Sequence, residues 1–288
     1  MLKASAASGV PTNPTSSRCR RILALYQRLR AQDSPAPSPV VNALFADLVS
    51  ACVRAETVDA RSVLEDPRIH EVRSDLIRLC AEGEGLLERD WARRALAAED
   101  PQAETAAFPY RDNYEQLARF EAHALAGAGY DPGATRRACF IGGGPLPLSG
   151  VLLYRNLTAE VTIVDRDAEA VDLSARLVGR LVPGGGIRVM LADATSDSDM
   201  VRAACGCDVV VLAALVGLTR TQKQVVLRAV GAALKPGAHL VVRSAEGLRS
   251  LLYPVVDIRD VRDAGFVPEA LVHPLGEVVN SVLVARRR

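Results

Sequence analysis

The chain has 288 residues, 49% of them hydrophobic, and its 35 Lys and Arg residues nearly balance 34 Asp and Glu residues, leaving a net charge of +1. This balance argues against binding to nucleic acid or to a membrane surface, since both partners favour a basic excess. No run approaches the ~18 apolar residues of a membrane span, no secretion signal is apparent, and no Cys or His spacing predicts a metal site. We therefore expect a cytoplasmic protein with one large and one smaller domain and no protein-bound metal.

The first 17 residues are rich in Ser, Ala and Pro, a composition that predicts a disordered N-terminal segment over residues 1–17. After this segment, hydrophobic residues recur at helical spacing up to about Gly127. Helices are expected at residues 22–29, 41–49, 69–99 and 112–126. The segment DSPAPSP at 33–39 separates the first two helices, because proline is excluded from a helix interior. The sequence thus predicts a helical-bundle domain over residues 18–128, which serves as a lid and substrate domain.

Beyond Gly127 the pattern changes to short β-branched runs separated by helical segments. The expected strands are 137–141, 160–164, 187–191, 208–213 and 238–242, and the expected helices are 145–157, 167–181 and 221–234. Such alternation predicts a parallel sheet covered on both faces. The runs 266–272 and 278–285 flank a short HPLGE turn and predict a terminal hairpin, so one strand must be antiparallel. This outline is that of an α/β, class I methyltransferase-like Rossmann domain, expected over residues 129–288.

A glycine-rich loop, FIGGGPLPLSG at 140–150, follows the first expected strand and opens a helix. Its three glycines allow the backbone to pass close to a ligand, and the helix N-terminus would face a carboxylate or a ribose. The dinucleotide fingerprint G-x-G-x-x-G is absent, because Pro147 stands where the third glycine is required. A plain tight turn is the alternative interpretation of this loop.

Two aspartates strengthen the ligand-binding interpretation. Asp165 ends the second strand, 23 residues after Gly142, where an acidic residue can bind ribose hydroxyls. Asp193 follows the third strand, where its carboxylate can accept the adenine amino group, although either aspartate can instead be a helix N-cap. Together with the loop they predict a nucleoside cofactor at the carboxyl edge of the sheet. The candidate cofactor-binding residues are Gly142, Gly143, Gly144, Pro145, Asp165, Asp193, Ala194, Leu212 and Ala213.

Several segments resemble the nicotianamine synthases of plants and archaea, together with related bacterial enzymes that make opine-type metallophore intermediates. The resemblance runs from about residue 22 to the end, with the same helical-then-α/β order. The matching segments are PSPVVNALF (37–45), LCAEGEGLLE (79–88), FPYRDNY (108–114), FIGGGPLPLS (140–149), DVVVLAALVG (208–217), RSAEGLRSLLYPVV (243–256) and HPLGEVVNSV (273–282).

The resemblance implies that S-adenosyl-L-methionine is the donor substrate. An amine would attack the γ-carbon beside the sulfonium, so that the 3-amino-3-carboxypropyl group is transferred and methylthioadenosine leaves. Nicotianamine synthesis from three S-adenosylmethionine molecules is the leading interpretation. The alternatives are a single transfer to histidine for an opine-type metallophore, and cyclisation to azetidine-2-carboxylate. An ordinary methyltransferase and a non-catalytic sensor represent other classes of protein, and a homodimer is left open.

By family motif, Glu84 is assigned as the base that deprotonates the amine, with Glu82 in reserve. Residues at i and i+2 face different sides of a helix, so only one of these two should point into the site. Tyr110 matches the family tyrosine paired with that glutamate. A surface glutamate and a packed core tyrosine are the alternative interpretations. The candidate substrate-binding residues are Asn42, Arg243, Ser244, Tyr253 and His273, of which Asn42 could simply pack and His273 could make a structural hydrogen bond.

The chain departs from the plant pattern beside the presumed acceptor site. Arg111 and Asp112 replace a second tyrosine and an asparagine, and Gly83 stands where plants usually have alanine. These departures bear on the acceptor and on the number of transfers, and they leave the donor unaffected. We expect the site to lie between the two halves, with the catalytic residues Glu84 and Tyr110 contributed by the helical half.

Overall fold

The computed structural model describes residues 14–54, 59–131, 133, 135–157, 159–195, 203–204 and 206–288. Helices come first along the chain: α1 (Pro14–Arg30), α2 (Pro39–Val53), α3 (Ala60–Leu64), α4 (Pro67–Ala97), α5 (Pro101–Ala106) and α6 (Arg111–Gly127). Strands and helices then alternate: β1 (Arg137–Ile141), α7 (Leu148–Leu157), β2 (Glu160–Asp165), α8 (Ala168–Leu181), β3 (Ile187–Leu191), β4 (Val209–Leu212), α10 (Arg220–Ala233) and β5 (His239–Ser244). The chain ends with the 3₁₀ helix η2 (Gly247–Leu251), α11 (Ile258–Asp263), β6 (Phe266–Val272) and β7 (Ser281–Arg287).

The N-terminal helices begin where a capping residue is followed by proline. Ser38, Asp66 and Asp100 are the N-caps of α2, α4 and α5, and each accepts a hydrogen bond from the first turn. Proline comes next in all three helices, where its missing N–H leaves no helical hydrogen bond unmade. The expected disorder over residues 1–17 needs a correction, because proline is also accepted in the first turn of α1. Residues 14–17 form the first turn of α1, which starts at Pro14, and residues 1–13 lie outside the described part of the chain.

The strands form one mixed sheet with the order β3-β2-β1-β4-β5-β7-β6. Strands β1 to β5 run parallel, and β7 is antiparallel to both β5 and β6. The predicted terminal hairpin is therefore confirmed, with β7 inserted beside β5. The sheet, its flanking helices and the preceding helical segment confirm the predicted fold class, an α/β, class I methyltransferase-like Rossmann architecture with N-terminal helices.

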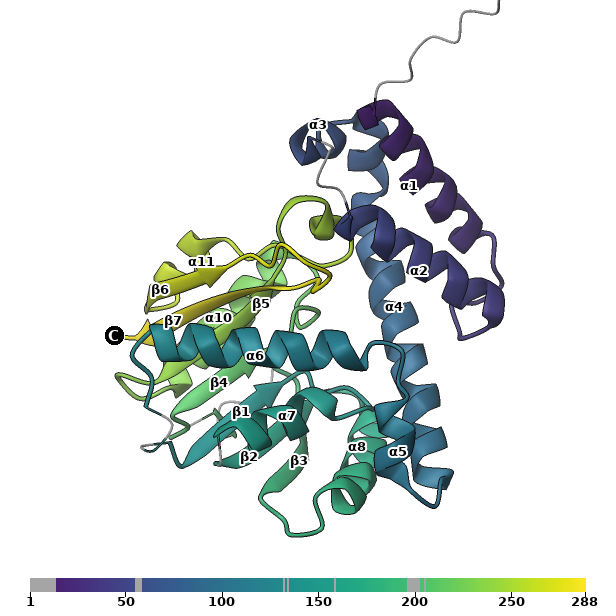
Figure 1. The fold of residues 1–288 in the computed structure, drawn as a ribbon. Helices are drawn as coiled ribbons and strands as arrows, with labels where there is room; N and C mark the ends of the chain where they lie inside the picture. Colours follow the sequence, from purple (N-terminus) through teal and green to yellow (C-terminus); the bar gives the residue numbers. More distant parts are fainter. Residues whose placement is uncertain are drawn as a thin grey trace, which may run out of the picture.

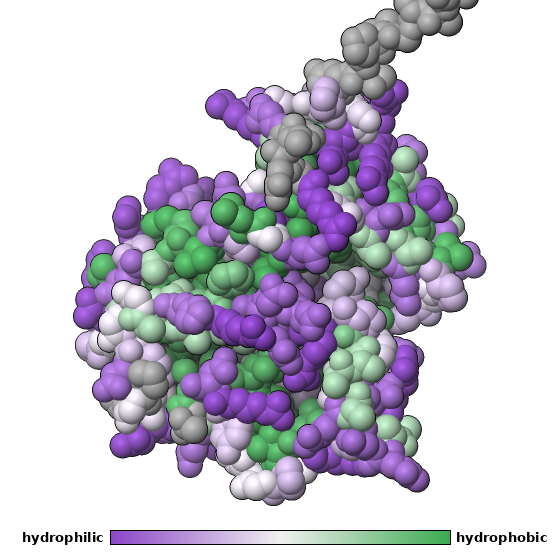
Figure 2. Space-filling model, in the orientation of Figure 1, coloured by the Kyte–Doolittle hydropathy of each residue, from purple (hydrophilic) through white to green (hydrophobic). Residues whose placement is uncertain are grey.

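Apolar cores cover both faces of the sheet. On one face α10 and α11 pack against the strands through residues such as Val226 and Val261. On the other face α6 and α7 pack through residues such as Leu117 and Leu153. Helix α6 precedes β1 in the chain yet lies along the sheet in Figure 1, and its outer side is largely hydrophilic in Figure 2. The central strands are thereby shielded from water on both faces, whereas the edge strands β3 and β6 are partly exposed.

Helix α4 spans two cores and passes the carboxyl edge of the sheet between them. Its first part, including Ile69 and Leu76, packs with α1, α2, α3 and η2. Its last part, including Trp91 and Ala95, packs with α7 and α8. Figure 1 shows this helix running beside the sheet from the α1–α3 cluster to α5 and α8. The middle of α4 is thus held in place from both ends. Among the described residues, no helix is long and apolar enough to cross a membrane.

Candidate active site

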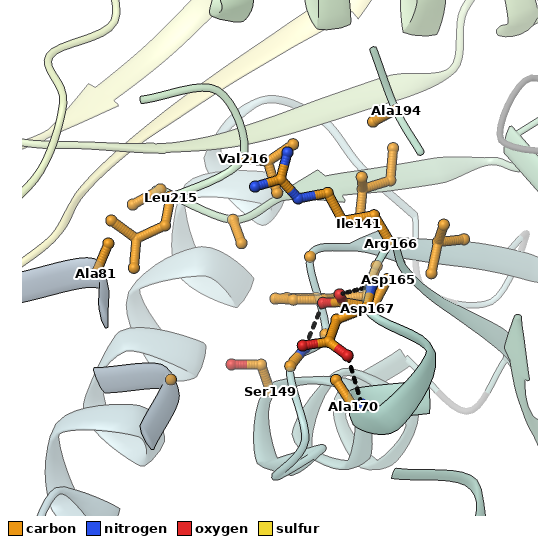
Figure 3. A pocket seen from close by; sticks show the side chains of 18 of the residues that line it. Ala81, Ile141, Ser149, Asp165, Arg166, Asp167, Ala170, Ala194, Leu215 and Val216 are labelled. Carbon is orange, nitrogen blue, oxygen red and sulfur yellow. Dashed lines mark hydrogen bonds between the residues drawn. The ribbon is translucent and has the colours of Figure 1, made fainter. Parts of the chain in front are cut away.

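A cavity of about 260 Å³ lies at the carboxyl ends of the central strands, with α4 forming its opposite wall. The loops after β1, β2, β3 and β4 line the cavity, as expected for the ligand-binding edge of an open α/β sheet. Figure 3 shows this cavity from close by. The lining includes Ala81, Glu84, Glu88, Tyr114, Gly142, Gly143, Gly144, Pro145, Asp165, Asp193, Ala194, Ala213, Leu215, Val216, Arg243, Tyr253 and Asn280.

The glycine loop is fastened to β2 and leaves no room for side chains. The N–H groups of Gly142 and Gly143 donate to the carbonyl oxygen of Val164, at 2.8 and 3.1 Å. Gly142 has a φ of 86°, in the left-handed region that disfavours other residues. A Cβ on Gly143 would overlap the Ile163 side chain. The loop is therefore a tight turn that brings bare backbone to the cavity.

We expect opposite effects on stability from two glycine-to-alanine substitutions. Gly142→Ala forces a left-handed alanine, at about 1–2 kcal/mol, and its methyl group overlaps Val216. Gly179→Ala lies in α8 with no atom near the new methyl group, and it should stabilise the fold by up to about 1 kcal/mol. Urea unfolding of both variants measures the two free energies. Effects of the same sign would contradict this account of the loop.

Asp165 and Asp193 both line the cavity, and each also organises its own loop. Asp165 accepts hydrogen bonds from the N–H of Gly144 at 2.8 Å and of Asp167 at 3.0 Å, as the dashed lines in Figure 3 show. Asp193 accepts from the N–H and the hydroxyl of Thr195, at 2.8 and 2.7 Å. The Thr195 N–H, ahead of its hydroxyl, lowers the pKa of Asp193 below its ordinary value. The N-cap of α8 is Asp167, so Asp165 itself is not a helix cap.

Eight of the nine candidate cofactor-binding residues line the cavity, and Leu212 is the exception among the described residues. Leu212 is fully buried within β4, because the strand continues through this position before the chain reaches the edge. The lining begins one residue later, at Ala213, and continues through Leu215 and Val216. Sequence reasoning also missed Arg166 and Asp167, although both directly follow Asp165 in the chain.

Glutamates on α4 form the wall that faces the glycine loop. The Tyr253 hydroxyl donates to Glu84 at 2.6 Å, and the Tyr114 hydroxyl donates to Glu88. Burial raises the pKa of Glu84, and it raises the pKa of Glu88 well above the ordinary range. Glu82, by contrast, is exposed and lies beside Arg78, on another side of the helix. Of the two glutamates of the E-G-E-G stretch, Glu84 lines the cavity and Glu82 does not, in keeping with the expected helical spacing.

A second cavity, of about 380 Å³, adjoins the first one on the side of the N-terminal helices. Glu84, Tyr114 and Tyr253 line both cavities and therefore mark where the two cavities meet. Asn42 and Tyr110 line the second cavity. The remaining lining is mainly apolar and includes Pro35, Pro37, Phe45, Val49, Gly83, Leu87, Phe108, Leu252 and Val279. The tyrosine hydroxyl bonded to Glu84 belongs to Tyr253, and Tyr110 shares the cavity with Glu84.

Arg243 lines the first cavity, but its guanidinium is already engaged by the protein. Its Nε and Nη2 atoms donate to the two carboxylate oxygens of Glu121, at 2.7 and 3.2 Å. A third bond, 3.0 Å long, runs from Nη1 to the Ser149 hydroxyl. The carboxylate that pairs with this candidate substrate-binding arginine thus comes from Glu121 on α6. A bidentate, buried ion pair with Glu121 therefore fixes the Arg243 side chain in the wall of the first cavity, which is called the floor of the site below.

The structure does not bring Ser244 and His273 to either of these cavities. Successive side chains of a strand point to opposite faces, so Ser244 faces away from the side of Arg243. Its hydroxyl accepts a hydrogen bond from the Val256 N–H at 2.9 Å. The His273 Nδ1 atom lies 2.8 Å from the Ser281 hydroxyl, and both Ser244 and His273 line a separate, third cavity. For His273 the structural hydrogen bond is the interpretation that the geometry supports.

Sequence reasoning also missed four polar residues that line or support the site. Glu88 lies one helical turn beyond Glu84 and Tyr114 one turn beyond Tyr110, so helical spacing was a usable signal for both. Asn280 lines the first cavity from the segment just before β7. The ion pair of Glu121 with Arg243 joins positions 122 residues apart, and no local sequence pattern predicts it. Among the described residues, no group of three or more His, Cys, Asp or Glu side chains is placed to hold a metal ion.

Comparisons with known proteins show the family to which the chain belongs. A family model described as "Nicotianamine synthase protein" matches residues 12–288. Nicotianamine synthase 9 of Hordeum vulgare is 42% identical over 272 residues, which cover 93% of this chain and 78% of the relative. Nicotianamine synthase 2 of Oryza sativa subsp. japonica is 40% identical over 271 residues, covering 93% and 81%.

Among solved structures, a point mutant of MtNAS in complex with S-adenosylmethionine matches with a TM-score of 0.77 and 25% identity. The match covers 94% of this chain and 98% of that one. Fold, sequence and family model thus agree over nearly the whole chain, which belongs to the nicotianamine synthase family.

Proposed function

We propose that this protein transfers the 3-amino-3-carboxypropyl group of S-adenosylmethionine to an amine, and that it makes nicotianamine from three donor molecules. The observation that carries the proposal is the position of Glu84 where the two cavities meet. One cavity has the features of a nucleoside site, and the other is a mainly apolar chamber. Relatives named nicotianamine synthase, about 40% identical over 93% of the chain, support the same activity.

The first cavity fits S-adenosylmethionine. The glycine loop presents backbone where any Cβ would collide with neighbouring side chains, which suits a closely bound ligand. Asp165 and Asp193, at the ends of β2 and β3, are placed to bind ribose hydroxyls and the adenine amino group. Ala194 and Leu215 supply apolar surface for the adenine ring. MtNAS, which has the same fold at 25% identity, has been crystallised with this donor.

When bound, S-adenosylmethionine supplies an electrophilic γ-carbon beside its sulfonium. The sulfonium activates three carbons equally well in principle, so the protein must select one of them by orientation. We assign this selection to the wall of α4, which places Glu84 and Glu88 opposite the glycine loop. Burial raises the pKa of Glu88 well above its ordinary value, and the Tyr114 hydroxyl donates a hydrogen bond to its carboxyl group.

Glu84 acts as the general base on the acceptor amine. The amine approaches from the second cavity, where Asn42 and Tyr110 bind it, and its nitrogen forms the new bond to the γ-carbon. The carbon–sulfur bond breaks with its electron pair staying on sulfur, which gives methylthioadenosine. The proton lost by the amine passes to the Glu84 carboxylate, which the Tyr253 hydroxyl holds in position at 2.6 Å.

The second cavity also bears on the choice of acceptor. Arg111 and Asp112, which depart from the plant pattern, are not among the described lining residues of either cavity. The Arg111 guanidinium instead pairs with Glu115 one turn along α6, at 2.6 Å. These two departures therefore give no support to a change of acceptor. The repeated reaction that yields nicotianamine stays ahead of a single transfer to histidine for a metallophore precursor.

Mass spectrometry of purified protein incubated with S-adenosylmethionine, alone and with histidine, tests the proposal. Methylthioadenosine together with nicotianamine in the sample without histidine is the expected result. A new product that forms only when histidine is present would move the assignment to the opine-type metallophore reaction. S-adenosylhomocysteine as the nucleoside product would show that a methyl group is transferred, and the proposal would be wrong.

The pH dependence of turnover gives a second test. A base works only when ionised, and burial raises the pKa of Glu84 above its ordinary value. Activity should therefore be lost as the pH falls through this raised pKa. In profiles of kcat/KM, which report the free enzyme, we expect an acid limb above the usual range of a glutamate near 4.3.

In profiles of kcat the same limb should lie at lower pH, because the positive sulfonium of the bound donor favours the carboxylate. The Glu84→Gln variant is the control and should lack this limb in its residual activity. An acid limb of kcat/KM that persists unchanged in Glu84→Gln would assign the titration to another group.

A further inference from the structure

Lys223 is a buried lysine in α10 that the proposed reaction does not use. It is 3% exposed, and its neighbours on the helix, Val226 and Leu227, are part of the core between α10 and the sheet. Among the described residues no charged group is recorded as acting on it, and burial alone lowers the pKa of Lys223 to about 7. Taking an amine out of water without a counter-charge is costly, so packing by itself does not account for a lysine at this position.

The Lys223 amine lies beneath the loop that follows β4. Its Nζ atom donates to the carbonyl oxygen of Ala214 at 2.9 Å and to the carbonyl oxygen of Val216. Leu215 stands between these two carbonyl groups, and all three loop residues line the first cavity. Either protonation state of the amine carries at least two N–H groups, enough for both carbonyls. The lysine thus holds the peptide group between Ala214 and Leu215 and the peptide group between Val216 and Gly217.

The loop depends on the Lys223 amine because its own backbone forms few hydrogen bonds. Over residues 213–217, the described backbone–backbone hydrogen bonds are those from the Ala213 N–H to Ile141 and from the Val216 N–H to Ala213. The Ala214 and Val216 carbonyl groups point to the protein interior, where an unmade hydrogen bond is costly. Without the amine, the loop would turn these groups towards water and move its cavity-facing side chains with them.

We infer that Lys223 is a positioning residue, which holds the Ala214–Val216 loop in the conformation that binds the nucleoside part of the donor. The inference rests on the proposed function, because it takes the first cavity to be the S-adenosylmethionine site. Lys223 does not touch the reacting atoms. Its loss should therefore weaken donor binding and raise KM while leaving kcat much less affected.

The test compares Lys223→Met with two other substitutions in α10. Methionine keeps much of the length of lysine but has no N–H to donate. Val226→Ala removes packing from the same core without touching a hydrogen bond, and Arg228→Met removes an exposed cation from the same helix. Isothermal titration with S-adenosylmethionine gives Kd, thermal unfolding gives Tm, and steady-state kinetics give KM and kcat separately.

We expect Lys223→Met to raise Kd and KM about tenfold or more, as for loss of hydrogen bonds to a buried group. Val226→Ala should lower Tm and leave Kd within twofold of the natural protein, and Arg228→Met should change neither. Should Lys223→Met fail to fold, Lys223→Gln provides the same comparison, because its shorter amide cannot reach both carbonyls.

A Kd for either folded Lys223 variant within twofold of the natural protein would overturn the inference. So would a rise in Kd for Val226→Ala equal to that for Lys223→Met, because the effect would then follow from lost stability. If the natural protein itself fails to bind S-adenosylmethionine, the proposed function is wrong and this inference fails with it. That outcome is visible before any variant is measured.

Discussion

Glu84→Gln should lower kcat by a factor of about 10² to 10⁴, the usual contribution of a positioned general base. Glutamine keeps the shape of the side chain, and its amide oxygen can still accept the hydrogen bond from Tyr253. It cannot take a proton from the acceptor amine, so the amine stays protonated or loses its proton only to water. Donor binding should weaken by much less than kcat falls, because the substitution removes one charge near the sulfonium and leaves the glycine loop and the two aspartates in place.

The matched control is Glu82→Gln, which makes the same chemical change two residues earlier in α4. Glu82 is exposed and lies on another side of the helix, so its substitution should leave kcat within twofold. Release of methylthioadenosine measures turnover, and titration calorimetry measures donor binding for both variants. If Glu84→Gln retains more than a tenth of the activity, or Glu82→Gln loses as much as Glu84→Gln, Glu84 is not the base.

Arg243→Met should lower the free energy of unfolding by about 3–5 kcal/mol, which is typical when one partner of a buried ion pair is removed. Arg243 and Glu121 are 7% and 6% exposed, and two hydrogen bonds join the guanidinium to the carboxylate. Without the arginine, the Glu121 carboxylate is left buried with no counter-charge. It must then either take up a proton or disturb the packing of α6 on the sheet.

The double variant Arg243→Met, Glu121→Met separates the ion pair from general packing. Removing both charges leaves no unpaired group, so the double variant should be more stable than Arg243→Met alone. Arg176→Met provides a surface control, since the pair of Arg176 with Asp172 is largely exposed and should contribute little. Urea unfolding measures all of these variants. A loss below about 1 kcal/mol for Arg243→Met would contradict the account of a buried pair that supports the floor of the site.

The lining of the first cavity at the sheet edge could be predicted from the sequence because its signals are local. The glycine loop, Asp165 and Asp193 each come directly after a β-branched run, and the ends of parallel strands meet at one edge of the sheet. The choice of Glu84 rests on the family resemblance, and helical periodicity required that Glu82 point elsewhere. Even Leu212 was misplaced by only one residue, since the strand ends just after it.

What only the tertiary structure decided are contacts between side chains far apart in the chain. Tyr253 reaches Glu84 across 169 residues, and Glu121 reaches Arg243 across 122. Neither contact has a period or a motif, because the packing of α4 on η2 and of α6 on the sheet brings these side chains together. Ser244 and Arg243 are neighbours in sequence, yet strand alternation sends them to opposite faces. A sequence pattern identifies which residues reach the edge of the sheet, and the packing of the helices determines which of them meet.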